Sequence, residues 1–156
     1  MKKSIKKGFG FGITSGIITT LGLIVGLYSG THSKLVVLSG ILTIAIADAM
    51  SDALGMHLSE ESVKGDCKEV WESTVSTFVF KFIFAGIFVI PFLFFELQRA
   101  IVFCVPLGLF LLGIFSYYIA KSHKEKPLQV ILEHVVIGVV VIVVTYFVGE
   151  LVGKFG

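Results

Sequence analysis

Hydrophobic residues fill long stretches of this chain, and polar residues gather in the short intervals between them. A helix needs about 20 mainly apolar residues to cross a bilayer. Five stretches reach that length, at Gly8–Gly30, Leu35–His57, Thr74–Phe95, Arg99–Ala120 and Leu128–Gly153. The pattern predicts an all-α integral membrane protein with five transmembrane helices.

The composition points the same way. Of the 156 residues, 55% are hydrophobic and only 15% are charged, whereas soluble domains carry about 25% charged residues. We therefore expect residues 1–156 to form one membrane domain embedded in the lipid bilayer. The basic N-terminus, MKKSIKK, precedes an apolar stretch without a clear small-residue cleavage site, which favours a retained first span. The net charge of +2 gives no reason to expect a nucleic-acid partner.

Basic residues are distributed unequally between the two ends of the predicted bundle. Cytoplasmic segments of membrane proteins carry an excess of lysine and arginine. Three basic residues fall at one end, namely Lys34, Arg99 and Lys154. Nine fall at the other, namely Lys2, Lys3, Lys6, Lys7, Lys64, Lys68, Lys121, Lys124 and Lys126. The N-terminus is therefore predicted to be cytoplasmic and the C-terminus outside.

Two aspartates, Asp48 and Asp52, interrupt the second apolar stretch one helical turn apart. A charged aspartate near the centre of a membrane helix costs about 2.5–3.5 kcal/mol, and two neighbouring carboxylates repel each other unless a proton or cation lies between them. We expect them to contact a cation, a proton or both. The alternative is a carboxylate pair that shares one proton and is merely tolerated. Lys81, in the third span, either reaches the inner interface or pairs with Asp48 or Asp52.

Further candidate ligands follow on the same helix and in the charged segments. Met56 continues the face of Asp52 at a spacing of four, and His57 comes next. A thioether or imidazole extends the range of ions to iron, manganese or zinc, although such residues more often only pack or meet headgroups. A possible cytoplasmic entry, or an ordinary solvated surface, is formed by Glu60, Glu61, Glu69, Glu72, Glu133 and His134.

Glycines and prolines suggest how the helices pack. The first span carries one glycine stripe at residues 8, 12 and 16 and another at residues 22, 26 and 30. One stripe could meet a neighbouring span and the other a second copy of the protein. Pro91 and Pro106 are predicted to kink the third and fourth spans, and Pro127 suits the first turn of the fifth.

Several segments resemble the vacuolar iron transporter family. The first span, GITSGIITTLGLIVG, is similar to that family's first helix, and ADAMSDALGMHLSEES is similar to its second. LFLLG in the fourth span, and Gly138, Tyr146 and Gly149 in the fifth, also resemble it. The resemblance implies a five-helix homodimer joined through the glycine-rich first helix, which lines the ion path. It also implies export of ferrous iron or manganese from the cytoplasm in exchange for protons.

The chain departs from the family pattern where the ion site is expected. Ser15 stands in place of a first-helix aspartate, and Asp52 stands in place of a second-helix methionine. Met56 and His57 replace a glutamate and a tyrosine, and the cytoplasmic metal-binding domain is missing, as in a short form. The expected metal site is therefore Asp48, Asp52, Ser15, Met56 and His57. A second aspartate in place of a methionine should favour harder ions such as manganese or magnesium.

The leading interpretation is a divalent-metal exporter of the plasma or inner membrane, or of a vacuolar-type membrane in a eukaryote. The metal ion would be its substrate, and no permanently bound cofactor is expected. The chain has no nucleophile elbow, phosphate-binding loop, CxxC or HExxH motif, so an enzyme is not expected. The alternatives are a non-transporting structural or regulatory dimer on the same scaffold, and a channel for protons or monovalent cations.

Overall fold

The computed structural model describes residues 2–63 and 66–155, and these residues form helices and short connections. The helices are α1 (Lys3–Thr31), α2 (Lys34–Ser62), α3 (Cys67–Ile87), α4 (Val89–Phe94), α5 (Leu97–His123) and α6 (Pro127–Gly153). With α3 and α4 counted together as Cys67–Phe94, five segments of the described residues are long and apolar enough to cross a membrane. The predicted all-α fold with five membrane-spanning helices is confirmed.

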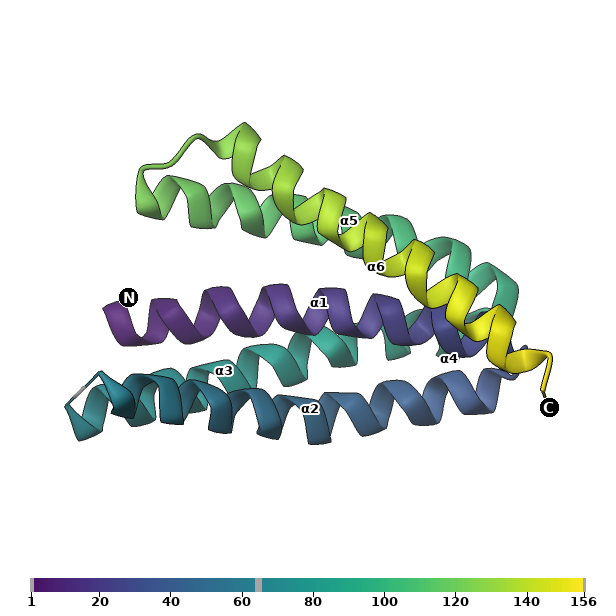
Figure 1. Cartoon of the computed structure of the whole chain (residues 1–156), viewed down its shortest axis with the longest axis horizontal. Helices are drawn as coiled ribbons and strands as arrows, with labels where there is room; N and C mark the ends of the chain where they lie inside the picture. Colours follow the sequence, from purple (N-terminus) through teal and green to yellow (C-terminus); the bar gives the residue numbers. More distant parts are fainter. Residues whose placement is uncertain (1, 64–65, 156) are drawn as a thin grey trace.

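The long helices lie side by side along the long axis of the molecule, and the two termini lie at opposite ends (Figure 1). Helix α1 lies between α5 and α6 on one side and α2 and α3 on the other, and it contacts all four. Its isoleucines and leucines, with Phe88 and Phe92, form the centre of the buried hydrophobic core. The first helix is therefore the central element of the bundle.

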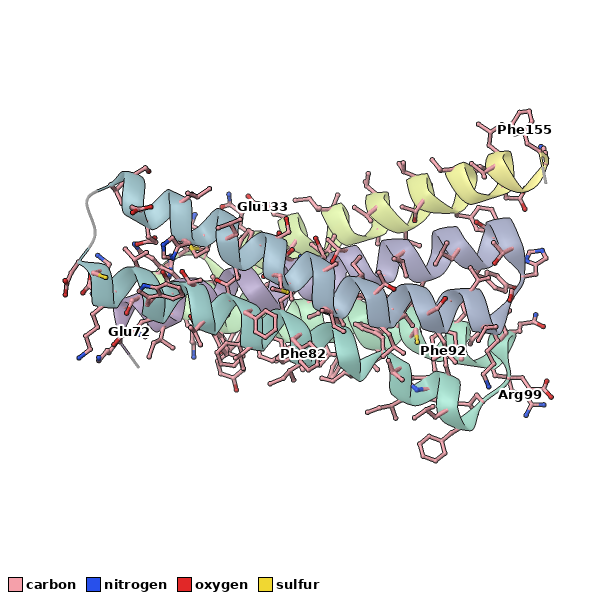
Figure 2. All side chains as sticks on the ribbon, turned by 90° about the horizontal axis from the view of Figure 1, so that it is seen from below. Glu72, Phe82, Phe92, Arg99, Glu133 and Phe155 are labelled. Carbon is pink, nitrogen blue, oxygen red and sulfur yellow. The ribbon has the colours of Figure 1, made fainter. Side chains whose placement is uncertain are left out.

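The flanks of the bundle are apolar and its ends are charged (Figure 2). Phe94 and Phe147 are among many large hydrophobic side chains that remain exposed, whereas Glu72 and Arg99 lie toward opposite ends. An apolar belt with charged ends suits a helix bundle surrounded by lipid.

The helices extend beyond the predicted spans. Residues 58–73 and 121–127 lie between predicted spans, but α2 continues to Ser62, α3 begins at Cys67 and α5 continues to His123. Hydropathy marks where a helix leaves the hydrocarbon. Backbone hydrogen bonding can continue past that point, because charged side chains on a helix end are well solvated.

Both glycine stripes of α1 pack against helices of the same chain. A Cβ added at Gly12 would lie 2.7 Å from the carbonyl oxygen of Thr77 in α3. A Cβ added at Gly30 would lie 2.9 Å from the carbonyl oxygen of Gly149 in α6. The absence of side chains therefore lets α1 approach two backbones closely, and neither stripe is left uncovered for a second copy.

The three prolines have different effects. In the third span, the helix is interrupted at Phe88 between α3 and α4, three residues before Pro91. This is where the proline ring removes a backbone hydrogen bond and crowds the preceding turn. Pro106 lies inside α5, which continues without interruption, and Pro127 opens α6 as predicted.

Candidate functional site

The centre of the candidate site is the ammonium group of Lys81, which forms ion pairs with Oδ2 of Asp48 and Oδ2 of Asp52. The Lys81 side chain comes from α3 and is only 1% exposed, whereas both aspartates come from α2. Of the two alternatives for Lys81, the structure supports pairing, and with both aspartates at once.

Helix α1 completes the site with Ser15. Its hydroxyl donates a hydrogen bond to Oδ2 of Asp52 at 2.6 Å and accepts one from Nζ of Lys81 at 3.0 Å. Close approach is possible because Gly16 leaves room for α3: a Cβ there would lie 3.1 Å from the carbonyl oxygen of Lys81. The structure thus brings together three of the predicted site residues, Ser15, Asp48 and Asp52, from two helices.

The two carboxylates are held differently. Oδ2 of Asp52 accepts hydrogen bonds from both Ser15 and Lys81. Oδ2 of Asp48 is buried and contacts the Lys81 ammonium without hydrogen-bond geometry, and it has no hydrogen-bond partner among the described residues. With all three groups ionised, one negative charge stays uncompensated. A buried site with net charge normally pairs with a further cation.

The aspartates are not sealed in packed hydrocarbon. The side chains of Asp48 and Asp52 are 31% and 22% exposed. An open groove of about 430 Å³ between α1 and α2 also reaches Asp48. It is lined by Leu23, Leu27, Val36, Ser39, Gly40, Thr43, Ile44, Ala47 and Asp48. Asp48 therefore faces an open groove on the flank of the bundle rather than tightly packed hydrocarbon.

His57, another predicted ligand on α2, has partners of its own on α3. His57 Nδ1 lies 3.0 Å from the hydroxyl of Thr74, and its ring packs edge-on against Trp71 at 4.8 Å between centroids. Met56 is half-buried one turn beyond Asp52. Within residues 2–63 and 66–155, no group of three or more histidine, cysteine, aspartate or glutamate side chains is arranged to hold a metal ion.

Two of the predicted entry carboxylates pair with lysines at the start of the chain. Both carboxylate oxygens of Glu60 accept hydrogen bonds from Nζ of Lys7, at 2.7 and 2.9 Å. Glu72 pairs with Lys2 and accepts a hydrogen bond from Ser4 at 2.6 Å. These contacts join α1 to the ends of α2 and α3, and they lower the negative charge that would attract a cation there. Glu61 and Glu69 are exposed.

The two predicted entry residues on α6 have partners of their own. Glu133 accepts a hydrogen bond from Gln129 at 3.1 Å, and His134 Nδ1 lies 3.1 Å from the hydroxyl of Ser116. His134 borders a cleft of about 1010 Å³ between α1 and the α5–α6 pair. Because Lys3, Lys6 and Lys7 also line this cleft, its charge does not favour cation entry.

Five apolar helices of spanning length, with an ionic cluster between α1, α2 and α3, define an integral membrane protein. Residues 62–150 match the sequence profile of the VIT family, and because this match covers more than half of the chain, the chain belongs to that family. Family membership implies transport of metal ions, iron or manganese. The matched region includes Lys81 but begins after Ser15, Asp48 and Asp52. No curated protein matches the chain.

Proposed function

We propose that this protein exports divalent metal ions from the cytoplasm in exchange for protons, with Asp48 and Asp52 as the ion-binding carboxylates. One observation carries the proposal: two partly exposed carboxylates lie at membrane depth beside a groove, in a chain of a metal-transporting family. Carboxylate and hydroxyl oxygens suit manganese and other hard divalent ions. Ser15, already hydrogen-bonded to Asp52, would supply the hydroxyl.

Exchange with protons follows from the chemistry of the carboxylates. An ionised carboxylate binds a cation, whereas a protonated one does not. Protons arriving from the outer side would neutralise Asp48 and Asp52 and release the metal. In this proposal the N-terminus is cytoplasmic, and Met56 and His57 are secondary ligands. His57 joins the site only when it leaves Thr74.

We further propose that the protein is a homodimer that uses a third face of α1. This face is distinct from both glycine stripes and carries Phe11, which is 45% exposed, and the half-buried residues Thr14, Ser15, Ile18 and Thr19. Small residues such as serine and threonine are enriched where membrane helices pack against each other. A second copy on this face would also shield the aspartates from lipid, so that the ion path would lie between the two subunits.

The test is metal loading of proteoliposomes across a panel of divalent ions, with and without a pH gradient. We expect manganese uptake in the unmodified protein to depend on the gradient and to fall by at least about tenfold in Asp48→Asn and in Asp52→Asn. The control is Asp66→Asn, which changes an exposed carboxylate at the start of α3. Unchanged uptake in Asp52→Asn would refute the assigned role of that residue.

The second candidate function is a non-transporting structural or regulatory membrane dimer. The observation that favours it is the pairing of Lys81 with both aspartates, which partly satisfies the site without any ion. In that case, purified protein would neither bind manganese nor load vesicles with it, and Asp48→Asn and Asp52→Asn would alter only stability or assembly.

A further inference from the structure

We propose that the ammonium group of Lys81 is a tethered cation that occupies the metal position, and that a divalent ion binds only by displacing it. This inference rests on the proposed function, because it concerns the same two aspartates. It goes further by making Lys81 a specificity-determining residue that selects divalent over monovalent cations.

The first argument is that the ammonium and a metal ion need the same oxygens. Nζ of Lys81 contacts one oxygen of Asp48 and one of Asp52, and it donates a hydrogen bond to the hydroxyl of Ser15. A dehydrated divalent ion would bind such oxygens at about 2.0–2.6 Å. Two cations cannot occupy this position at once. In the structure, the ammonium of Lys81 is the cation that occupies it.

The second argument is that the contacts leave the site able to exchange its occupant. Asp48 and Asp52 are 31% and 22% exposed, whereas Lys81 is 1% exposed, so an incoming ion meets the carboxylates before the ammonium. Oδ2 of Asp48 is held by charge alone, without a hydrogen bond. It can therefore turn to a new ligand without losing a directional contact.

The third argument is that a displaced ammonium has an acceptor one turn away on its own helix. The buried hydroxyl of Thr77 lies four residues before Lys81, toward the N-terminal end of α3. This hydroxyl donates to the backbone carbonyl of Ser73, which leaves its oxygen lone pairs free to accept. The flexible four-carbon stem of a lysine allows its charge to move along a helix in this way.

Charge decides which ions can displace the lysine. When a doubly charged ion replaces the singly charged ammonium between two carboxylates, the site becomes neutral. When sodium or potassium replaces it, the charge of the site is unchanged, and the ion still loses its water. Lys81 therefore opposes monovalent ions more effectively than divalent ions, and its removal should both tighten manganese binding and admit sodium.

The experiment measures manganese binding by purified protein through the paramagnetic signal of free Mn²⁺, at increasing sodium concentrations. For Lys81→Gln we expect manganese binding at least about tenfold tighter than in the unmodified protein, and weakened by sodium at concentrations that leave the unmodified protein unaffected. Lys81→Arg, which keeps the tethered charge, should not show the gain. Lys68→Gln is the control, since Lys68 is an exposed lysine of the same helix.

A second measurement uses the unmodified protein and does not depend on the folding of a variant. Mn²⁺ should increase the labelling of Lys81 by a small amine-reactive reagent, read by mass spectrometry, because the displaced ammonium leaves its buried position. If Mn²⁺ binds but labelling of Lys81 stays constant and Lys81→Gln binds no more tightly, the tethered-cation proposal is wrong and the proposed function stands. If neither protein binds Mn²⁺, both fail.

Discussion

Gly12 in α1 lies directly against the backbone of Thr77 in α3, so closely that a methyl group at Gly12 would lie 2.7 Å from the Thr77 carbonyl oxygen. Because the obstacle is backbone, it cannot move aside as a side chain would. This contact fixes the distance between the helices that carry Ser15 and Lys81, and it therefore sets the geometry of the ionic cluster.

The first prediction concerns this contact. Gly12→Ala should force α1 and α3 apart and lower the free energy of unfolding by about 1–3 kcal/mol, the usual effect of overpacking. The control is Gly113→Ala in α5, where an added methyl group meets nothing within 4 Å. Thermal or denaturant unfolding in detergent measures both variants. Equal stability of the two variants would show that the close approach of α1 and α3 is not needed.

The second prediction concerns the contact between α1 and α6. The buried hydroxyl of Ser29 lies 2.9 Å from the carbonyl oxygen of Tyr146 and donates to it across the helices. Ser29→Ala should lower the free energy of unfolding by about 0.6 kcal/mol, the average for hydrogen bonds between membrane helices, and by no more than about 1.7 kcal/mol, the largest value. Ser29→Val should lower the free energy of unfolding further, because its additional methyl group would crowd Gly149. The space there is small: a Cβ added at Gly149 would lie 2.1 Å from the Ser29 hydroxyl. If Ser29→Val is no less stable than Ser29→Ala, this packing is wrong.

The third prediction separates the two aspartates by stability. Asp52→Asn removes the carboxylate that accepts hydrogen bonds from Ser15 and Lys81, and it should lower the free energy of unfolding by about 1.5–3 kcal/mol, the usual contribution of a hydrogen bond to a charged group. Asp48→Asn should cost less, because Lys81 keeps both of its hydrogen bonds. Unfolding in detergent without metal gives both values. A larger loss for Asp48→Asn would mean that the ionic contact matters more than the hydrogen bonds.

The fourth prediction tests the proposed dimer face. In a Cys67→Ser background, which removes the exposed native cysteine, Ile18→Cys should form disulfide-linked dimers in membranes. Phe147→Cys should not, although Phe147 is 66% exposed on α6. Gel mobility with and without reductant gives the result. Cross-linking of Phe147→Cys alone would place the interface on α6 instead.

The five spans could be predicted because an apolar stretch of spanning length has few other stable conformations. The ends of the helices could not, because charged residues permit helix outside the hydrocarbon. The depth of Lys81 does not depend on these ends. It lies about two turns past Thr74, at the level of the aspartates, with which it pairs.

The ionic cluster itself was only half predictable. Asp48 and Asp52 stood out because carboxylates are costly in an apolar helix, and the family resemblance placed Ser15 opposite them. The spacing of glycines shows that a helix has close-packing faces, but it does not show which helix covers each face. Whether His57 turns toward Asp52 or toward Thr74 depends in the same way on the packing of α2 against α3, which the sequence of one helix does not determine.

The buried residues of α2 in its site-bearing half are Ala45, Ala49 and Ala53, one per turn. Alanine side chains are single methyl groups, so this face of α2 has no large side chain that interlocks with a neighbouring helix. The two glycines of α2, Gly40 and Gly55, contact no backbone of another helix. Helix α1, by contrast, is locked to α3 and α6 by backbone contacts. The carboxylates thus sit on a helix that its neighbours hold through side chains, while the serine and lysine that bind them sit on two helices in direct backbone contact.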